Sequence, residues 1–282
     1  MITRLAFVAL ALLIAIPASA QFVTDLAAIP VAARGPGLQG TQWVTDLTIH
    51  NPMDHPMNIF LAFLPADQDN DGDENLRPLH LEPHETMILE DVISSLFDLD
   101  EDIKGIVTIN CGAAILNNPE GTVFHAVARI YNTGGGDGTY GQTVPALFAV
   151  LNVGWSPSVI TGARNDEDYR SNLGLCGMSF TEQVEVHYRV TAADGSVVIE
   201  DSKVLHTSSL SQWSFEELGV GVADGPLTVE LWIDPDQVSD DPCADPTANS
   251  FFAYVSKVDN STGDAEFIYA SPMEPFICPA EE

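Results

Sequence analysis

The stretch Val184-Glu185-Val186-His187-Tyr188-Arg189-Val190 alternates apolar and polar side chains at every step. Successive side chains of a β-strand point to opposite faces, so such a segment buries one face and exposes the other to water. We therefore expect a strand whose apolar residues lie in a core. These inward residues are Val184, Val186, Tyr188 and Val190. An acidic hairpin follows and ends at Asp194-Gly195.

The same order of features occurs earlier in the chain, which indicates an internal repeat. Asn58 to Leu64 has the composition of a strand and is also followed by an acidic hairpin, which ends at Asp71-Gly72. Further strands, a short helical turn and a closing pair of strands follow in the same order in both halves. Short strands separated by Pro, Gly, Asn and Asp turns, without alternating helices, are typical of antiparallel β-sandwiches.

We therefore predict an all-β protein built from two tandem immunoglobulin-like antiparallel β-sandwiches, each with one short helical turn. The predicted division is a signal peptide at 1–20, a first sandwich at 21–152, a second at 153–273 and a C-terminal tail at 274–282. For the helical turns, Ser214 and Glu217 have the spacing of a capping box, and Asp91 is a candidate N-cap for a turn that starts at Val92.

The N-terminus has the features of a secretory signal. Arg4 supplies a positive charge, Leu5 to Ile16 is an apolar run, and Ala18-Ser19-Ala20 is a small-residue cleavage site. The apolar run is too short to span a bilayer as a helix. We expect a secreted protein, extracellular or at the cell surface, with the periplasm as an alternative, and no membrane span.

Composition limits the partners. The 282 residues include 41 acidic and only 10 basic side chains, for a formal charge of −31. Hydrophobic residues make up 45% of the chain, which favours a folded protein over a disordered acidic one. Nucleic acids and anionic lipids are polyanions that bind basic patches, so the charge argues against both as partners.

Several short motifs resemble a known module. In the first half these are Gly40-Thr41-Gln42-Trp43, Thr45-Asp46-Leu47, Asn51-Pro52, Arg129-Ile130-Tyr131-Asn132 and Tyr140-Gly141-Gln142-Thr143-Val144-Pro145-Ala146; in the second they are Tyr169 to Gly174 and Val258 to Asp264. Together they look like an uncharacterised tandem immunoglobulin-like module of secreted bacterial proteins. The resemblance implies immunoglobulin-like domains and export, and it implies no catalytic residues.

The acidic hairpin at 67–75 has the chemistry of a cation site. Carboxylates at alternate positions followed by Gly72 can wrap a loop around calcium, which takes six to eight oxygen ligands. The predicted calcium ligands are Asp67, Asp69, Asp71, Asp73 and Glu74. A genuine EF-hand is excluded because Pro78 occupies the position of the required Glu. An ordinary solvated turn is the alternative, since Asp, Asn and Gly are common turn residues.

The four cysteines are predicted to form disulfides after export. Cys111 lies in the first half, whereas Cys176, Cys243 and Cys278 lie in the second half and its tail. Three connectivities are possible. We favour Cys111 with Cys176 and Cys243 with Cys278, because the latter two both lie next to prolines in loop or tail segments. Zinc is less favoured because the chain has no CxxC pair.

Motifs for catalysis are weak. His80 and His84 have a spacing that suits a helical zinc site, but Pro83 prevents that helix. We therefore expect no enzymatic activity. The predicted function is a secreted, non-catalytic structural or interaction protein, such as a surface, matrix, filament or adhesion component that pairs with proteins or with its own copies through edge strands.

Two other functions remain open. A carbohydrate-binding module requires exposed aromatic side chains, for which Trp155 and Trp232 are the candidates. A secreted hydrolase, the less favoured option, requires two converging carboxylates in a cleft.

Overall fold

The computed structural model describes residues 23–37, 40–70, 75–134, 138–147, 156–179, 182–234, 236 and 251–273. The predicted signal peptide, the predicted boundary between 152 and 153, and the predicted tail all lie outside these residues. The described chain is nearly all β-strand in antiparallel sheets, which confirms the predicted all-β sandwich class. Its two helices, α2 (Val92–Ser95) and α3 (Ala113–Leu116), are far too short to cross a membrane.

The first sandwich contains eight strands in two layers. The strands are β1 (Leu26–Pro36), β2 (Gln42–His50), β3 (Met57–Pro65), β4 (Arg77–Leu81), β5 (Thr86–Leu89), β6 (Ile103–Asn110), β7 (His125–Asn132) and β8 (Tyr140–Pro145). One layer has the order β4-β3-β6-β1, and the other joins β5, β2, β7 and β8. β1 serves both layers, because most of it pairs with β6 while Gly35 and Pro36 pair with β2.

The second sandwich repeats this arrangement. Its strands are β9 (Ser158–Ala163), β10 (Tyr169–Gly177), β11 (Val184–Thr191), β12 (Val197–Leu205), β13 (Leu210–Ser214), β14 (Leu227–Trp232), β15 (Phe251–Asp259), β16 (Ala265–Tyr269) and β17 (Ser271–Pro272). The layers are β13-β10-β15-β16 and β12-β11-β14-β9-β17. The pairs among β9 to β16 match those eight places earlier, except that β9 pairs with β17 and, among the described strands, not with β10, whereas β1 pairs with β2.

The burial of β11 shows the alternation that its sequence predicts. All four apolar residues of the opening stretch are buried, whereas the polar residues between them are half-buried on the outer face. The buried set packs with residues of β9, β10, β14 and β15 in the second core.

The helical turns differ in part from the prediction. Ser214 and Glu217 form the capping box: the Glu217 N–H donates to the Ser214 hydroxyl at 3.2 Å, and the Ser214 N–H donates to the Glu217 carboxylate at 2.7 Å. Asp91 is the N-cap residue of α2 with a left-handed backbone, but its side chain makes no cap hydrogen bond: Oδ2 pairs with Arg34 at 3.0 Å, and Oδ1 is buried without a hydrogen-bond partner in the described chain. The prediction of Asp91 as a capping side chain was therefore wrong.

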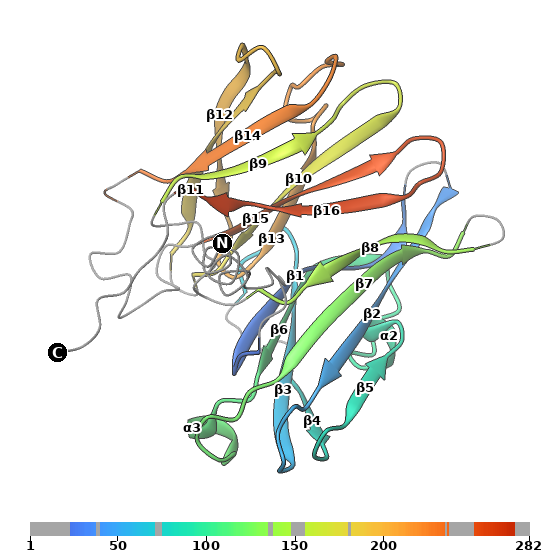
Figure 1. The fold of residues 1–282 in the computed structure, drawn as a ribbon, viewed down its shortest axis with the longest axis vertical. Coiled ribbons are helices and arrows are strands. Elements are labelled where there is room, and N and C mark those ends of the chain that lie inside the picture. The colour runs from blue at the N-terminus through green and yellow to red at the C-terminus, as the bar shows by residue number, and fades with distance from the viewer. Residues whose placement is uncertain are drawn as a thin grey trace, which may run out of the picture.

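The two sandwiches share a hydrophobic interface. On β15, Phe251 packs into the second core, whereas the neighbouring Phe252 and Tyr254 belong to the core cluster of the first sandwich. Cys176 and Leu210 join the same cluster from β10 and β13. Because side chains alternate along a strand, the β13-β10-β15-β16 layer presents its outer face to the first sandwich. Figure 1 shows β8 and β16 side by side at this boundary.

Candidate functional site

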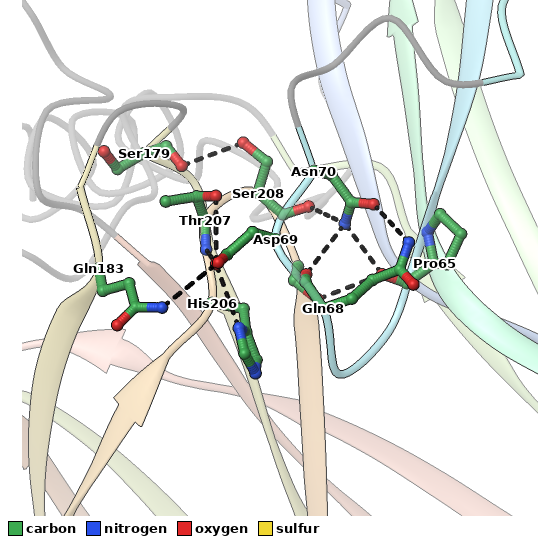
Figure 2. A network of polar contacts seen from close by, with 10 residues as sticks. Pro65, Gln68, Asp69, Asn70, Ser179, Gln183, His206, Thr207 and Ser208 are labelled. Atoms are coloured by element: carbon green, nitrogen blue, oxygen red, sulfur yellow. Dashed lines mark hydrogen bonds and ion pairs between the residues drawn. The ribbon is translucent and has the colours of Figure 1, made fainter.

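The acidic hairpin contacts the second sandwich (Figure 2). Asp69 Oδ1 accepts a hydrogen bond from the backbone N–H of Thr207 at 2.9 Å and lies 3.1 Å from Nδ1 of His206. The side-chain amide of Gln183 donates to the same oxygen at 3.3 Å. The Thr207 N–H, followed by Gln183 and His206, lowers the pKa of the Asp69 carboxyl. This carboxylate therefore joins the end of β3 to the turn between β12 and β13.

Asn70 strengthens the same contact from a buried position. Its side chain is 3% exposed, and Nδ2 donates to the carbonyl oxygens of Pro65 and Ser208, each at 2.9 Å. Its backbone N–H donates to the Thr207 carbonyl at 3.0 Å. One amide group thus bridges a strand end of the first sandwich and a turn of the second, as Figure 2 shows.

The predicted calcium ligands divide into two groups. Asp67 Oδ2 lies 3.6 Å from Nζ of Lys104, and Asp69 belongs to the network with Thr207. Asp71, Asp73 and Glu74 lie outside the described residues. Within the described ranges no group of three or more His, Cys, Asp or Glu side chains is placed to hold a metal ion. The calcium site stays a prediction, and both described carboxylates already have protein partners.

Two of the four cysteines lie in the described chain. Cys111 and Cys176 are buried free thiols. Cys111 Sγ donates to the Thr122 carbonyl at 3.4 Å, and Cys176 Sγ donates to the Pro30 carbonyl at 3.0 Å. Cys243 and Cys278 lie outside the described residues, and the predicted connectivity stays a prediction.

A cleft of about 550 Å³ opens between the two sandwiches. It begins where the outward residues of the second sandwich change from apolar to polar. On β10 the buried Cys176 gives way to Asn172 and Arg170, and on β15 Tyr254 gives way to Ser256. The apolar ends of these strands pack against the first core, so the polar ends form one wall of the cleft. The other wall comes from β1, β2, β6, β7 and β8.

The cleft contains several side-chain amides. Gln142 is 7% exposed, and its Oε1 accepts a hydrogen bond from the hydroxyl of Ser256 at 3.0 Å, across the boundary between the sandwiches. In the described part of the chain, Nε2 of Gln142 has no hydrogen-bond partner, and neither do the side-chain amides of Asn172 and Gln212. Unused donors and acceptors therefore face the cleft.

Three basic side chains line the cleft, and two of them are neutralised. Arg34 pairs with Asp91, and Lys104 pairs with Asp67. Arg170 instead donates from Nη1 to the Asn260 side-chain oxygen at 2.9 Å, and no carboxylate of the described residues lies within ion-pair distance of it. Burial lowers the pKa of Arg170, against a smaller opposing effect of the charge on Asp259.

Two carboxylates also line the cleft, Asp102 and Glu217. The backbone N–H and the hydroxyl of Ser214 donate to Glu217 at 2.7 and 2.8 Å, and these bonds lower the pKa of the Glu217 carboxyl. A glycosidase general acid needs a raised pKa so that it carries a proton near neutral pH. Glu217 has the opposite environment and serves as a cap.

The tryptophans are partly covered. Trp232 is half-buried on the outer face of β14, where the ring of His187 stacks on it at 5.6 Å and the guanidinium of Arg189 lies 5.4 Å from its centroid. Trp43 is half-buried and lines the cleft. Trp155 lies outside the described residues.

The cleft and the bridge between the sandwiches were not predicted from the sequence. Both depend on how two repeats meet, which composition and spacing within one repeat do not specify. One local signal was present: on β10 the residues facing away from their own core include Arg170 and Asn172 at one end and Cys176 at the other. A change from polar to apolar along one outward face indicates that only part of that face is covered.

Comparisons with known proteins add little about function. No protein-family model matches the chain, and no curated protein matches it. Among solved structures, a glycosyl hydrolase family 2 member from Bacteroides cellulosilyticus is 10% identical over 86% of this chain, with a TM-score of 0.18. A second family 2 member, from Bacteroides cellulosilyticus DSM 14838, is 11% identical over 82% of this chain, with a TM-score of 0.16. The matched part spans 26% and 28% of those chains, and such low TM-scores give no indication of shared activity.

Proposed function

We propose that the protein is an exported, non-catalytic interaction protein that assembles through the exposed edge of β12. The proposal rests on the exposure of this edge strand and of its valine side chains. Among the described strands, β12 is the outermost of its layer and pairs with β11 alone. Val197, Val198 and Val204 on this strand are 56%, 37% and 58% exposed. An exposed edge with unpaired backbone groups is a template for pairing with another strand.

The equivalent edge of the first sandwich is protected, which makes the contrast informative. β4 has five residues and contains Pro78, which has no N–H to offer a neighbouring strand. β12 has nine residues and no proline. Charged side chains can also block an edge, but Glu200 pairs with Arg189 at 2.6 Å, and the ammonium of Lys203 lies 5.7 Å from the ring centroid of Trp213. These two charges are engaged by the protein's own sheet, whereas Asp201 is exposed and forms no ion pair in the described chain.

The rigid link between the sandwiches suits a structural role. The Asp69 and Asn70 contacts and the shared hydrophobic interface hold the β12 edge in a fixed direction relative to the first sandwich. A chain of copies joined at such an edge would have a defined geometry. The lowered pKa of Glu217 argues against this residue as a general acid, and the N-terminal signal supports export.

Sedimentation velocity over a range of concentrations in 0.15 M salt tests the assembly. We expect the protein to associate as concentration rises, and Val204→Lys to abolish association because a lysine on an edge strand opposes pairing. Val222→Lys is the matched control, since Val222 is a 79% exposed valine in a loop. A protein that stays monomeric throughout, or one that the two substitutions affect equally, would contradict the proposal. Detection of the processed chain outside the cytoplasm tests export.

A second candidate function is saccharide binding, which the cleft specifically favours. Carbohydrate sites combine an aromatic surface with planar hydrogen-bonding groups, and the cleft offers Trp43 together with the amides of Gln142, Asn172 and Gln212. This function is compatible with assembly through β12, because the two surfaces do not overlap: no residue of β12 lines the cleft.

A further inference from the structure

We infer that the cleft between the sandwiches binds a saccharide that carries a carboxylate, and that Arg170 recognises this charge. The inference rests on the saccharide binding proposed above and specifies its ligand class. It does not depend on assembly through β12.

The unmet hydrogen-bonding capacity of the cleft indicates a polar ligand. Side-chain amides with unused hydrogen-bonding capacity in the described chain come from β8, β10 and β13: Gln142 uses only its Oε1, and Asn172 and Gln212 use neither amide atom. Gln142 is 7% exposed, and Asn172 and Gln212 are half-buried at the cleft, where a ligand can reach their amide groups. A ligand rich in hydroxyl groups can donate to and accept from such amides at several positions at once.

The state of Arg170 indicates that the ligand is an anion. The chain has 41 acidic and 10 basic side chains, so a partly buried guanidinium without a carboxylate partner is unusual here. Arg34 and Lys104, the other basic residues of the cleft, are each paired with an aspartate. Burial disfavours the charged form of Arg170, and a bound carboxylate would restore the lost solvation through two parallel hydrogen bonds.

The distribution of carboxylates in the cleft is consistent with this assignment. Glu217 is held by Ser214, and the positive charge of Lys104 contributes to its lowered pKa. The charge of Lys104 is thus shared between Asp67 and Glu217. Two cleft charges therefore have no ion-pair partner in the described chain, the positive charge of Arg170 and the negative charge of Asp102.

The shape of the site favours a sugar over a small inorganic anion. A volume of about 550 Å³ falls within the range of small-molecule pockets and far exceeds what a single ion needs. Trp43 supplies an apolar surface in the same cleft as the amides. The Ser256–Gln142 hydrogen bond ties the opposing walls together, so little ordering is required when a ligand binds.

Calorimetric titration of the full secreted chain with acidic oligosaccharides tests the inference. The probes are disaccharides that carry a single carboxylate, from galacturonate, glucuronate or mannuronate, and each is compared with its methyl ester, which keeps the sugar skeleton and removes the charge. A chelator is present throughout because the acidic hairpin is a predicted calcium site. We expect at least one acid form to bind, and to bind at least tenfold more tightly than its ester.

The variants locate the site. Arg170→Gln is expected to remove at least tenfold of the affinity for the acid and to leave ester binding unchanged. Arg129→Gln is the matched control, because Arg129 is exposed on β7, donates to Thr139, lies over the ring of Tyr131 and does not line the cleft. Thermal melting of both variants verifies that they are folded.

The possible results distinguish saccharide binding in general from recognition of a carboxylate by Arg170. Equal affinity for acid and ester would retain saccharide binding and overturn carboxylate recognition. Binding that is insensitive to Arg170→Gln would place the ligand elsewhere and overturn the assignment of the cleft. Failure of every acid and every ester to bind would overturn both the inference and the second candidate function, while assembly through β12 would be unaffected.

Discussion

The carboxylate of Asp69 accepts a hydrogen bond at 2.9 Å from the backbone N–H of Thr207, a residue 138 positions later in the chain. The first sandwich thereby uses an acidic residue to contact a turn of the second. The contact lies at one end of the shared hydrophobic interface, to which Leu210 belongs, and the Leu210 carbonyl accepts a bond from the Asp67 N–H. Polar and apolar contacts thus act together to fix the two sandwiches.

Replacing the carboxylate tests the polar part of this contact. The pKa of the Asp69 carboxyl is lower in the folded protein than in the unfolded chain, so the folded state binds fewer protons. This carboxylate therefore stabilises the fold at pH values above its ordinary pKa. The stabilisation is lost as the pH falls through the lowered pKa. We expect Asp69→Asn to lower the melting temperature at pH 7 and to reduce the loss of stability below about pH 4. The measurement is thermal melting between pH 2 and pH 7.

Asp194→Asn is the control for that series. The Asp194 carboxyl also has a lowered pKa, caused by Ser196, but it lies at the exposed turn between β11 and β12, within one sandwich. In both variants the melting temperature should fall less at low pH than in the unmodified protein. Only Asp69→Asn should increase hydrogen exchange at the β12–β13 turn. Equal exchange in the two variants would show that Asp69 does not hold the sandwiches together.

Asn70→Ala removes the buried half of the contact. The carbonyl of Ser208 loses the Asn70 amide as a donor, and a buried polar group without a partner costs about 1–3 kcal/mol. We expect a lower urea midpoint, or two separate transitions if the sandwiches unfold independently. Gln68→Ala is the control, because the Gln68 amide donates only to Asn70 within the same loop. A midpoint no lower than that of the control contradicts the bridging role.

Gly174 leaves space for the ring of Tyr254, which packs in the hydrophobic interface between the sandwiches. A Cβ at this position would lie 2.1 Å from Cζ of Tyr254, which pairs with Gly174 across β10 and β15. Because Tyr254 is fully buried and stacked on Phe267 at 4.8 Å, it has little freedom to move. We expect Gly174→Ala to destabilise the protein by about 1–3 kcal/mol in urea unfolding. Gly221→Ala, where a Cβ has open space, should change stability far less, and equal effects would contradict the argument.

The sequence predicted those features that depend on one strand or one repeat. The alternation of β11 gave its buried face, and the Ser214–Glu217 spacing gave a real capping box, because both patterns are satisfied locally. Asp91 occupies the predicted N-cap position, but its left-handed backbone and the pairing of its Oδ2 with Arg34, 57 residues earlier, are not features that the local pattern specifies. The cleft was missed for the same reason: Arg170 and Gln142 meet only when the two sandwiches pack together.

Intact mass distinguishes the predicted disulfide from the free thiols of the structure. The Cys111 N–H donates to the Asp25 carbonyl, and Cys176 Sγ donates to the Pro30 carbonyl; five residues of extended chain span roughly 16 Å. A disulfide requires Cα atoms within about 7 Å, so joining these residues would require backbone movement. Burial also raises the pKa of Cys111 to about 12 and raises that of Cys176.

We therefore expect both thiols to resist alkylation in the native protein and to react once it is unfolded. The measurement is mass after alkylation with and without denaturant, before any reduction. A mass two units lower than that of the reduced chain, with the bond mapped to Cys111 and Cys176, would instead support the predicted pairing. Rapid native labelling of Cys176 would contradict its burial.

Calcium addition tests the remaining prediction for the acidic hairpin. Carboxylates crowded in residues 67–74 repel one another, and a divalent ion that binds only the folded hairpin stabilises the protein by about 2.7 kcal/mol at 100 times its dissociation constant. We expect the melting temperature to rise with calcium and to return to its original value with a chelator.

The double substitution Asp71→Asn and Asp73→Asn should remove this rise, while leaving the Asp69 contact to Thr207 intact. Asp194→Asn, in the corresponding hairpin of the second sandwich, should retain it. A rise of equal size with magnesium at the same concentration would indicate general screening of the −31 charge, and an unchanged midpoint would leave the hairpin with its interdomain contacts as its only supported role.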